Sequence, residues 1–122
     1  MGTAIKTGIE SKKMNATTSK STHLARYDEF VSYGNNGLPG DVDQLMAALI
    51  TQDDLATSRL VDYALSLVST REGIQQVRRY LFQGIQIQRN YAALFFKRKG
   101  WTDLLDEAIA QGKIDFEQAY AK

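Results

Sequence analysis

The residues with the most evident binding chemistry lie in one part of the chain, residues 71–99. This part carries seven arginine and lysine residues against one acidic residue, Glu72. It also holds aromatic rings and amides, most densely in the stretch QRNYAALFFKRKGW (88–101). Cationic side chains neutralise phosphates, and rings and amides contact bases, so this composition is typical of a nucleic-acid surface.

Helical spacing divides these residues into buried and exposed positions. In the first helix expected here, Ile74, Val77 and Leu81 form an apolar stripe, and the arginines face away from it. Phe82 lies on the same polar side, which indicates either cover from a neighbouring helix or a contact surface. With the basic fringe of the next helix, the candidate binding surface consists of Arg71, Arg78, Arg79, Phe82, Arg89, Lys97 and Lys99.

The rings of the stretch 88–101 are expected to be core residues. On a helix over residues 85–99 the apolar side chains cover a wide arc, which predicts burial on two sides near the centre of the domain. Phe95 and Phe96 point away from the polar strip, so they are poor platforms for stacking bases. Trp101 is expected to cover the junction between two helices.

The acidic residues elsewhere offer a second explanation of the basic segment. Residues 21–70 carry two basic and seven acidic side chains, residues 100–122 carry two and five, and the whole chain has a net charge of +1. Acidic helices before and after a basic pair can surround it and cancel its field, which weakens the nucleic-acid interpretation. Asp62 is expected to pair locally with Arg59, three residues before it.

Catalytic chemistry has little support in the sequence. The chain has no cysteine and one histidine, His23, which excludes thiolate nucleophiles, sulfur-ligated metals and metal sites with two histidines from one chain. Acidic residues such as Asp41 and Asp43 fall at predicted helix starts, where the helix dipole explains them. The loop GNNGLPGD (34–41) lacks the Lys-Ser/Thr ending of a phosphate-binding P-loop. We therefore predict no enzyme, no catalytic residue, no cofactor and no metal site.

Two regions of different character follow one another along the chain. Residues 1–22 are rich in Ser, Thr and Lys and lack aromatic residues, which predicts a flexible tail. Residues 23–122 show helical periods and no strand pattern, which predicts a single helical domain. We expect an all-α fold of six to seven short-linked amphipathic helices, packed as αα-hairpins in a bundle or a short HEAT-like stack. LVDYAL (60–65) and LLDEAI (104–109) resemble each other, which leaves an internal repeat open.

Capping signals predict several helix boundaries. Ser69-x-x-Glu72 and Asp115-x-x-Gln118 have the residue types of a capping box, so a helix is expected to begin at each. Gly100 follows three cationic residues and is expected to end the helix over 85–99.

These features predict a binding protein. No apolar run approaches the ~20 residues of a membrane-spanning helix, and no secretory signal is visible, so we expect no membrane partner and a cytoplasmic location. Our first hypothesis is a non-catalytic helical adaptor that acts through contact with an unknown protein partner or through self-association as a homo-oligomer. The alternative is nucleic-acid binding through the basic helix pair 71–99, aided by the lysines of the tail.

Overall fold

The computed structural model describes residues 15–52 and 54–120, which fold into helices joined by short links. The helices are α1 (Asn15–Asn36), α2 (Pro39–Thr51), α3 (Leu55–Ser66), α4 (Arg71–Gln83), α5 (Gln86–Lys99), α6 (Thr102–Ala110) and α7 (Phe116–Tyr120). No strand occurs within the described ranges. The prediction of an all-α fold with six to seven short-linked helices is confirmed.

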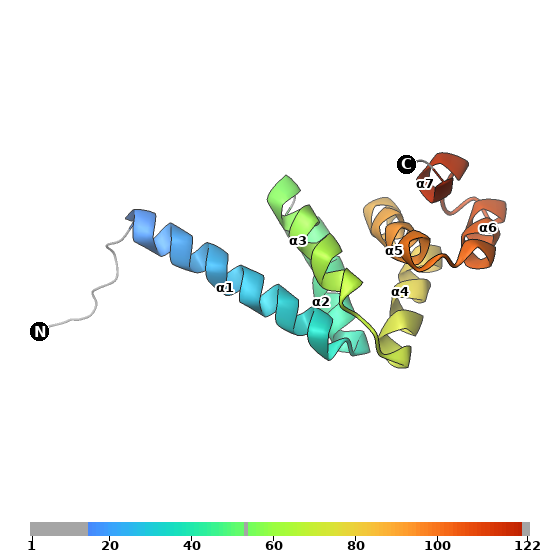
Figure 1. Ribbon diagram of the computed structural model, residues 1–122. Helices are drawn as coiled ribbons and strands as arrows, with labels where there is room; N and C mark the ends of the chain where they lie inside the picture. The colour runs from blue at the N-terminus through green and yellow to red at the C-terminus, as the bar shows by residue number, and fades with distance from the viewer. Residues whose placement is uncertain (1–14, 53, 121–122) are drawn as a thin grey trace, which may run out of the picture.

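The helices form an elongated stack of hairpins (Figure 1). The long helix α1 packs against both α2 and α3 at one end of the stack, and α6 and α7 form the other end. Between them, α2 contacts α4, α3 contacts α5, and α5 contacts α6 and α7. Consecutive helices thus pair as αα-hairpins, as expected, and of the two arrangements left open the fold adopts the stack.

The two similar segments of the sequence occupy different places in this stack. Residues 60–65 lie in α3, the second helix of its hairpin, whereas residues 104–109 lie in α6, the first helix of its hairpin. Repeating units of a solenoid place similar segments at the same position in each unit. The similarity between the two segments therefore does not mark equivalent units.

The first helix begins earlier than the sequence predicts. α1 starts at Asn15, so residues 15–22 are helical although they were expected to belong to the tail. Adding residues to an existing helix requires no new nucleus, so a helix anchored by its C-terminal half can extend into a segment without an apolar period. The expected flexibility of residues 1–14 stays a prediction, because these residues lie outside the described ranges.

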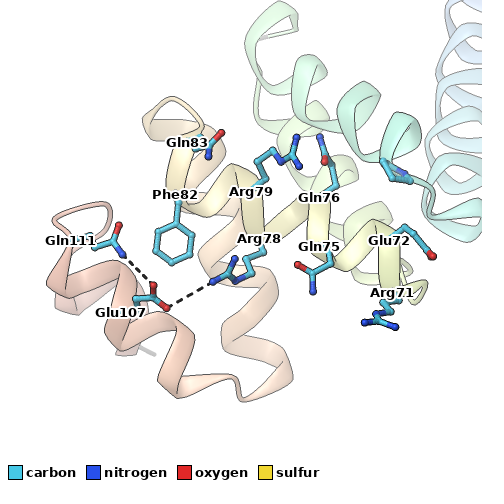
Figure 2. Close-up of a pocket in the computed structure, with 11 residues that line it drawn as sticks. Arg71, Glu72, Gln75, Gln76, Arg78, Arg79, Phe82, Gln83, Glu107 and Gln111 are labelled. Atoms are coloured by element: carbon cyan, nitrogen blue, oxygen red, sulfur yellow. Dashed lines mark hydrogen bonds and ion pairs between the residues drawn. The ribbon is translucent and has the colours of Figure 1, made fainter.

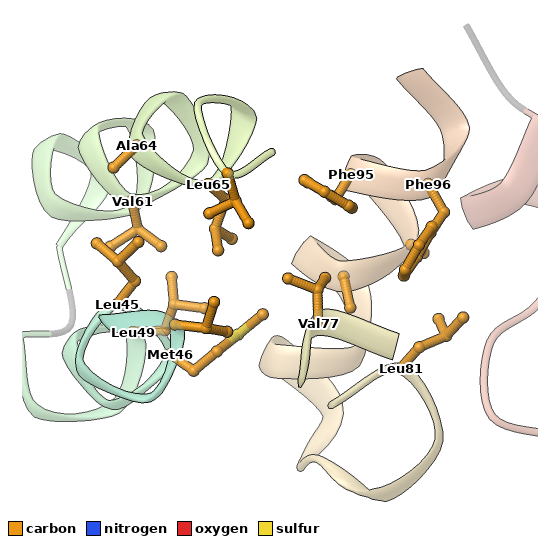
Figure 3. Packing of buried hydrophobic residues seen from close by; sticks show 14 of the residues in the cluster. Leu45, Met46, Leu49, Val61, Ala64, Leu65, Val77, Leu81, Phe95 and Phe96 are labelled. Atoms are coloured by element: carbon orange, nitrogen blue, oxygen red, sulfur yellow. The ribbon is translucent and has the colours of Figure 1, made fainter. Parts of the chain in front are cut away.

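The hydrophobic core follows the stack from α1 to α7, and Figure 3 shows its part between α2 and α5. Phe96 is fully buried, Phe95 is only 3% exposed, and the two rings meet edge to face with centroids 5.0 Å apart. Burial of one large apolar side chain stabilises a fold by about 1.5–3 kcal/mol, so the rings of α5 contribute substantially to stability. Their predicted inward orientation is confirmed. The ring centroids of Trp101 and Phe96 lie 5.1 Å apart, although Trp101 remains partly exposed.

Helix caps agree with the sequence signals at some boundaries and are shifted at others. The Asp115 and Gln118 side chains exchange hydrogen bonds with each other's main-chain amides at 2.8 and 3.0 Å, as predicted. Before α4, Thr70 is the cap in place of the expected Ser69, and its hydroxyl accepts a 2.9 Å hydrogen bond from the Gly73 amide. The same hydroxyl donates to the carbonyl of Gly37, a tertiary contact that explains the shift.

Close backbone approach holds α1 against α3. A Cβ atom added to Gly34 would lie 2.1 Å from the carbonyl oxygen of Ala64, much closer than any van der Waals contact. A Cβ atom added to Gly73, at the start of α4, would lie 2.0 Å from the carbonyl oxygen of Gly37. The end of α1 therefore contacts α3, and the link after α1 contacts α4, through positions that accommodate only glycine.

The substitution Gly34→Ala tests this contact. The added methyl group must push α1 away from α3, so we expect the free energy of unfolding to fall by at least about 2 kcal/mol in urea denaturation. Gly40→Ala is the matched control, since a Cβ atom there meets nothing within 4 Å. The control is expected to keep or slightly raise stability, by up to about 1 kcal/mol. Equal unfolding midpoints for the two variants would contradict the close approach of Gly34 to the Ala64 carbonyl group.

Candidate functional site

An open groove of about 680 Å³ follows the exposed face of α4 (Figure 2). Its walls come from the start of α2 and from α6, so it crosses the first helices of three successive hairpins. The lining residues are Pro39, Arg71, Glu72, Gln75, Gln76, Arg78, Arg79, Phe82, Gln83, Glu107 and Gln111. Arginines, glutamines and one phenylalanine dominate this surface.

The spacing of residues along α4 produces the floor of the groove. Residues three and four apart lie on one face of a helix, so α4 presents two parallel stripes. The first stripe is Arg71, Gln75, Arg78 and Phe82, and the second is Glu72, Gln76, Arg79 and Gln83. On the opposite face Val77 and Leu81 are fully buried. Core packing thus fixes which side of α4 faces the groove.

A polar contact between α2 and α4 also orients the groove helix. Oδ1 of Asp43 accepts hydrogen bonds from Nε2 of Gln76 at 2.8 Å and from the Tyr80 hydroxyl at 2.7 Å. Burial and the hydrogen bond to Asp43 raise the pKa of Tyr80 to about 12. Gln76 is therefore held toward α2, and Gln75 extends from the other stripe (Figure 2).

Arg78 connects the two sides of the groove. Its guanidinium lies 4.0 Å from a carboxylate oxygen of Glu107 on α6 and 5.3 Å from the centroid of the Phe82 ring. Glu107 also accepts a 3.2 Å hydrogen bond from the Gln111 side chain. Arg71 and Arg79 are exposed, and their guanidinium groups have no ion-pair or hydrogen-bond partner among residues 15–52 and 54–120.

The seven residues of the sequence-based candidate surface do not all meet in one place. Arg71, Arg78, Arg79 and Phe82 line the groove together. The other three, Arg89, Lys97 and Lys99, belong to α5 and are not among the lining residues. The Nζ atom of Lys99 lies 5.0 Å from the centroid of the Phe95 ring, in a separate small hollow.

Arg89 and Arg98 bind parts of the fold itself. Arg89 donates from Nε to the carbonyl oxygen of Lys113 at 2.7 Å and from a terminal nitrogen to that of Gly84 at 2.8 Å. Arg98 donates from both terminal nitrogens to the two carboxylate oxygens of Asp62 on α3, one of them at 2.8 Å. Asp62 thus pairs with Arg98 of α5 and not with Arg59, because the packing of α3 on α5 places a guanidinium where it can form a bidentate interaction with the carboxylate.

Sequence reasoning missed the α6 side of the groove. Glu107 and Gln111 lie one helical turn apart and both contribute to the wall opposite Arg78. Neither residue belongs to the candidate surface that the sequence predicts. Only their spacing of four residues, which places both on one face of a helix, could have linked them to each other.

The described residues contain neither a cluster of metal ligands nor a membrane-spanning helix. No group of three or more His, Cys, Asp or Glu side chains there is arranged to hold a metal ion. Within the same part of the chain, no helix has the length and apolar character needed to cross a membrane. Comparisons of the chain with models of protein families, with curated proteins and with solved structures find no match. The groove along α4 is therefore the feature of this protein that bears most directly on its function.

The Tyr80–Asp43 contact predicts a pH dependence of stability. Because the folded protein raises the pKa of Tyr80 above its ordinary value of 10.0, folding favours the protonated phenol. The stabilisation is complete below pH 10 and is lost as the pH rises toward about 12. Phenylalanine has no phenol to ionise. When the pH rises from 10 to about 12, we therefore expect the free energy of unfolding, measured by urea denaturation, to fall less in Tyr80→Phe than in the wild type. Identical losses in the two proteins would contradict this role of the hydrogen bond.

The two hydrogen bonds of Arg89 predict a structural role for this residue. Arg89→Met keeps most of the aliphatic chain but leaves two carbonyl groups without their donor, so we expect unfolding free energy to fall by about 2 kcal/mol. Arg71→Met removes the same charge from an exposed position and is expected to change stability by less than about 0.5 kcal/mol. Thermal unfolding monitored by circular dichroism distinguishes the two, and equal effects would argue against a structural Arg89.

Proposed function

We propose that the protein is a non-catalytic binding protein that holds a segment of another protein in the groove along α4. The observation that carries this proposal is the groove itself, which extends over three successive hairpins of a stacked helical fold. Stacks of helix pairs create extended binding surfaces because each pair adds a similarly oriented helix. The cytoplasmic location expected from the sequence is part of the same proposal.

The lining side chains have the chemistry of peptide recognition. The amide groups of Gln75 and Gln83 each offer both donors and an acceptor, as the main chain of a bound peptide requires. Phe82 offers a partly exposed ring, and arginine and aromatic side chains are common anchors of protein interfaces. The groove carboxylates, Glu72 and Glu107, come from different helices, and each lies beside arginines of the groove.

Three observations weigh against nucleic-acid binding as the main function. The rings of Phe95 and Phe96 are buried and offer no stacking surface for bases. Arg89 and Arg98 are engaged within the fold, so they add little to a continuous cationic surface. The groove also contains carboxylates, which repel phosphates.

Self-association remains the second form of the protein-binding proposal, and light scattering over a range of concentrations tests it.

A random peptide library displayed on phage tests the proposal directly. The immobilised full chain is expected to enrich a set of related peptides. Their affinity should fall at least about tenfold for Arg78→Ala and for Phe82→Ala, because tenfold corresponds to about 1.4 kcal/mol and the main anchors of an interface contribute about 2 kcal/mol or more each. Lys99→Ala, a cation outside the groove, is the control and is expected to bind as the wild type does.

Folding of each variant is checked by circular dichroism and thermal unfolding, since Phe82 also packs against the core. Enrichment of no peptide family by the wild-type chain would contradict the proposed function. Enriched peptides that bind equally well to Arg78→Ala and Lys99→Ala would place the binding surface elsewhere.

A further inference from the structure

The charges across the groove indicate what kind of segment fits it. In the free protein a carboxylate of the fold, Glu107, already faces Arg78 at 4.0 Å, and both side chains are about half exposed (45% and 49%). Two further arginines, Arg71 and Arg79, line the same groove and have no side-chain partner among the described residues. Among the described residues, the groove thus has two arginines without an acidic partner, Arg71 and Arg79, and one arginine, Arg78, that faces Glu107.

We propose that the groove binds an acidic segment of a partner protein, and that Glu107 competes with this segment for Arg78. The inference rests on the proposed function and specifies the chemistry of the partner. A ligand carboxylate that reaches Arg78 replaces an exposed ion pair of small worth by a hydrogen-bonded contact on the groove floor. The cation–ring contact between Arg78 and Phe82 places the guanidinium beside an apolar surface, where an apolar side chain of the ligand can pack.

The positions along α4 specify a spacing for the ligand. Arg71 and Arg78 are seven residues apart, which corresponds to about 10.5 Å along a helix. An extended peptide covers this distance in about three residues. Phe82 lies about 6 Å further along α4, or about two extended residues. The groove therefore fits two acidic residues three positions apart and an apolar residue two positions beyond them, or the reverse order in the opposite chain direction.

The mixture of charges favours a peptide over a nucleic acid. The carboxylates of Glu72 and Glu107 lie among the three arginines of the groove. A nucleic acid carries a charge at every residue and would bring phosphates close to both carboxylates. A peptide carries its charges only at chosen positions and can place neutral residues beside Glu72. Sparse negative charge at the right spacing thus matches the groove better than continuous negative charge.

Two pools of synthetic 12-residue peptides test the proposal with the full chain. One pool has glutamate at two positions three apart and leucine two positions later, among mixed Ala, Gly and Ser residues. The other pool is identical except that glutamine replaces both glutamates. In fluorescence anisotropy at low salt we expect the glutamate pool to bind at least about tenfold more tightly, because charge-assisted hydrogen bonds are about twice as strong as neutral ones.

Substitutions on the protein test the role of Glu107. Glu107→Gln is expected to bind the glutamate pool about twofold to fivefold more tightly, the range for removing an exposed competing ion pair. Glu117→Gln removes the same charge from an exposed position on α7 outside the groove and is expected to bind as the wild type does. Arg78→Gln is expected to weaken binding at least about tenfold.

Three results would overturn the inference. They are equal binding of the two pools, equal affinities of Glu107→Gln and Glu117→Gln, and tighter binding of a single-stranded oligonucleotide than of the glutamate pool at the same salt. If either of the first two results is found, the proposed function still stands, provided that the phage library has enriched neutral peptides whose binding depends on Arg78. If no peptide of any composition binds, both the inference and the proposed function fail.

Discussion

The burial of Val77 and Leu81 is the constraint on which the rest of this structure depends. Both side chains are fully buried against neighbouring hairpins, so they fix the rotation of α4 about its axis. Once that rotation is fixed, the helical repeat places every arginine and glutamine of α4 on the opposite face. The hydrogen bonds of Asp43 to Gln76 and Tyr80 act in the same direction, because they join the flank of α4 to α2. The groove is therefore a consequence of core packing.

The stacked arrangement explains why a surface of this kind stays open. Each hairpin buries its apolar residues against its neighbours, and within the described ranges no further layer of helices covers the polar side of α4. In the stack, α4 forms the floor of the groove, and the start of α2 and α6 line its two sides (Figure 2). The close approaches of Gly34 to α3 and of Gly73 to the link after α1 hold the first layers together.

The cations of residues 71–99 have different roles although the sequence presents them as one group. Arg98 pairs with a carboxylate on α3, and Arg89 binds two carbonyl groups at the hairpin links. Arg78 is shared between Glu107 and the Phe82 ring, whereas Arg71 and Arg79 face the groove without such partners among the described residues. The fold therefore neutralises some of these cations and exposes others.

The sequence by itself determined the helical class, some helix boundaries such as the start of α7, the inward position of Phe95 and Phe96, and the arginine side of α4. Each of these depends on residues within one or two turns of each other, where the 3.6-residue period and capping hydrogen bonds act. Only the tertiary structure decided that Glu107 faces Arg78, that Asp62 pairs with Arg98, and that the cap of α4 moves to Thr70. These contacts join residues about 30 or more positions apart, and their geometry depends on how whole helices pack. No local pattern encodes that packing, so the wall of the groove could not be read from the chain.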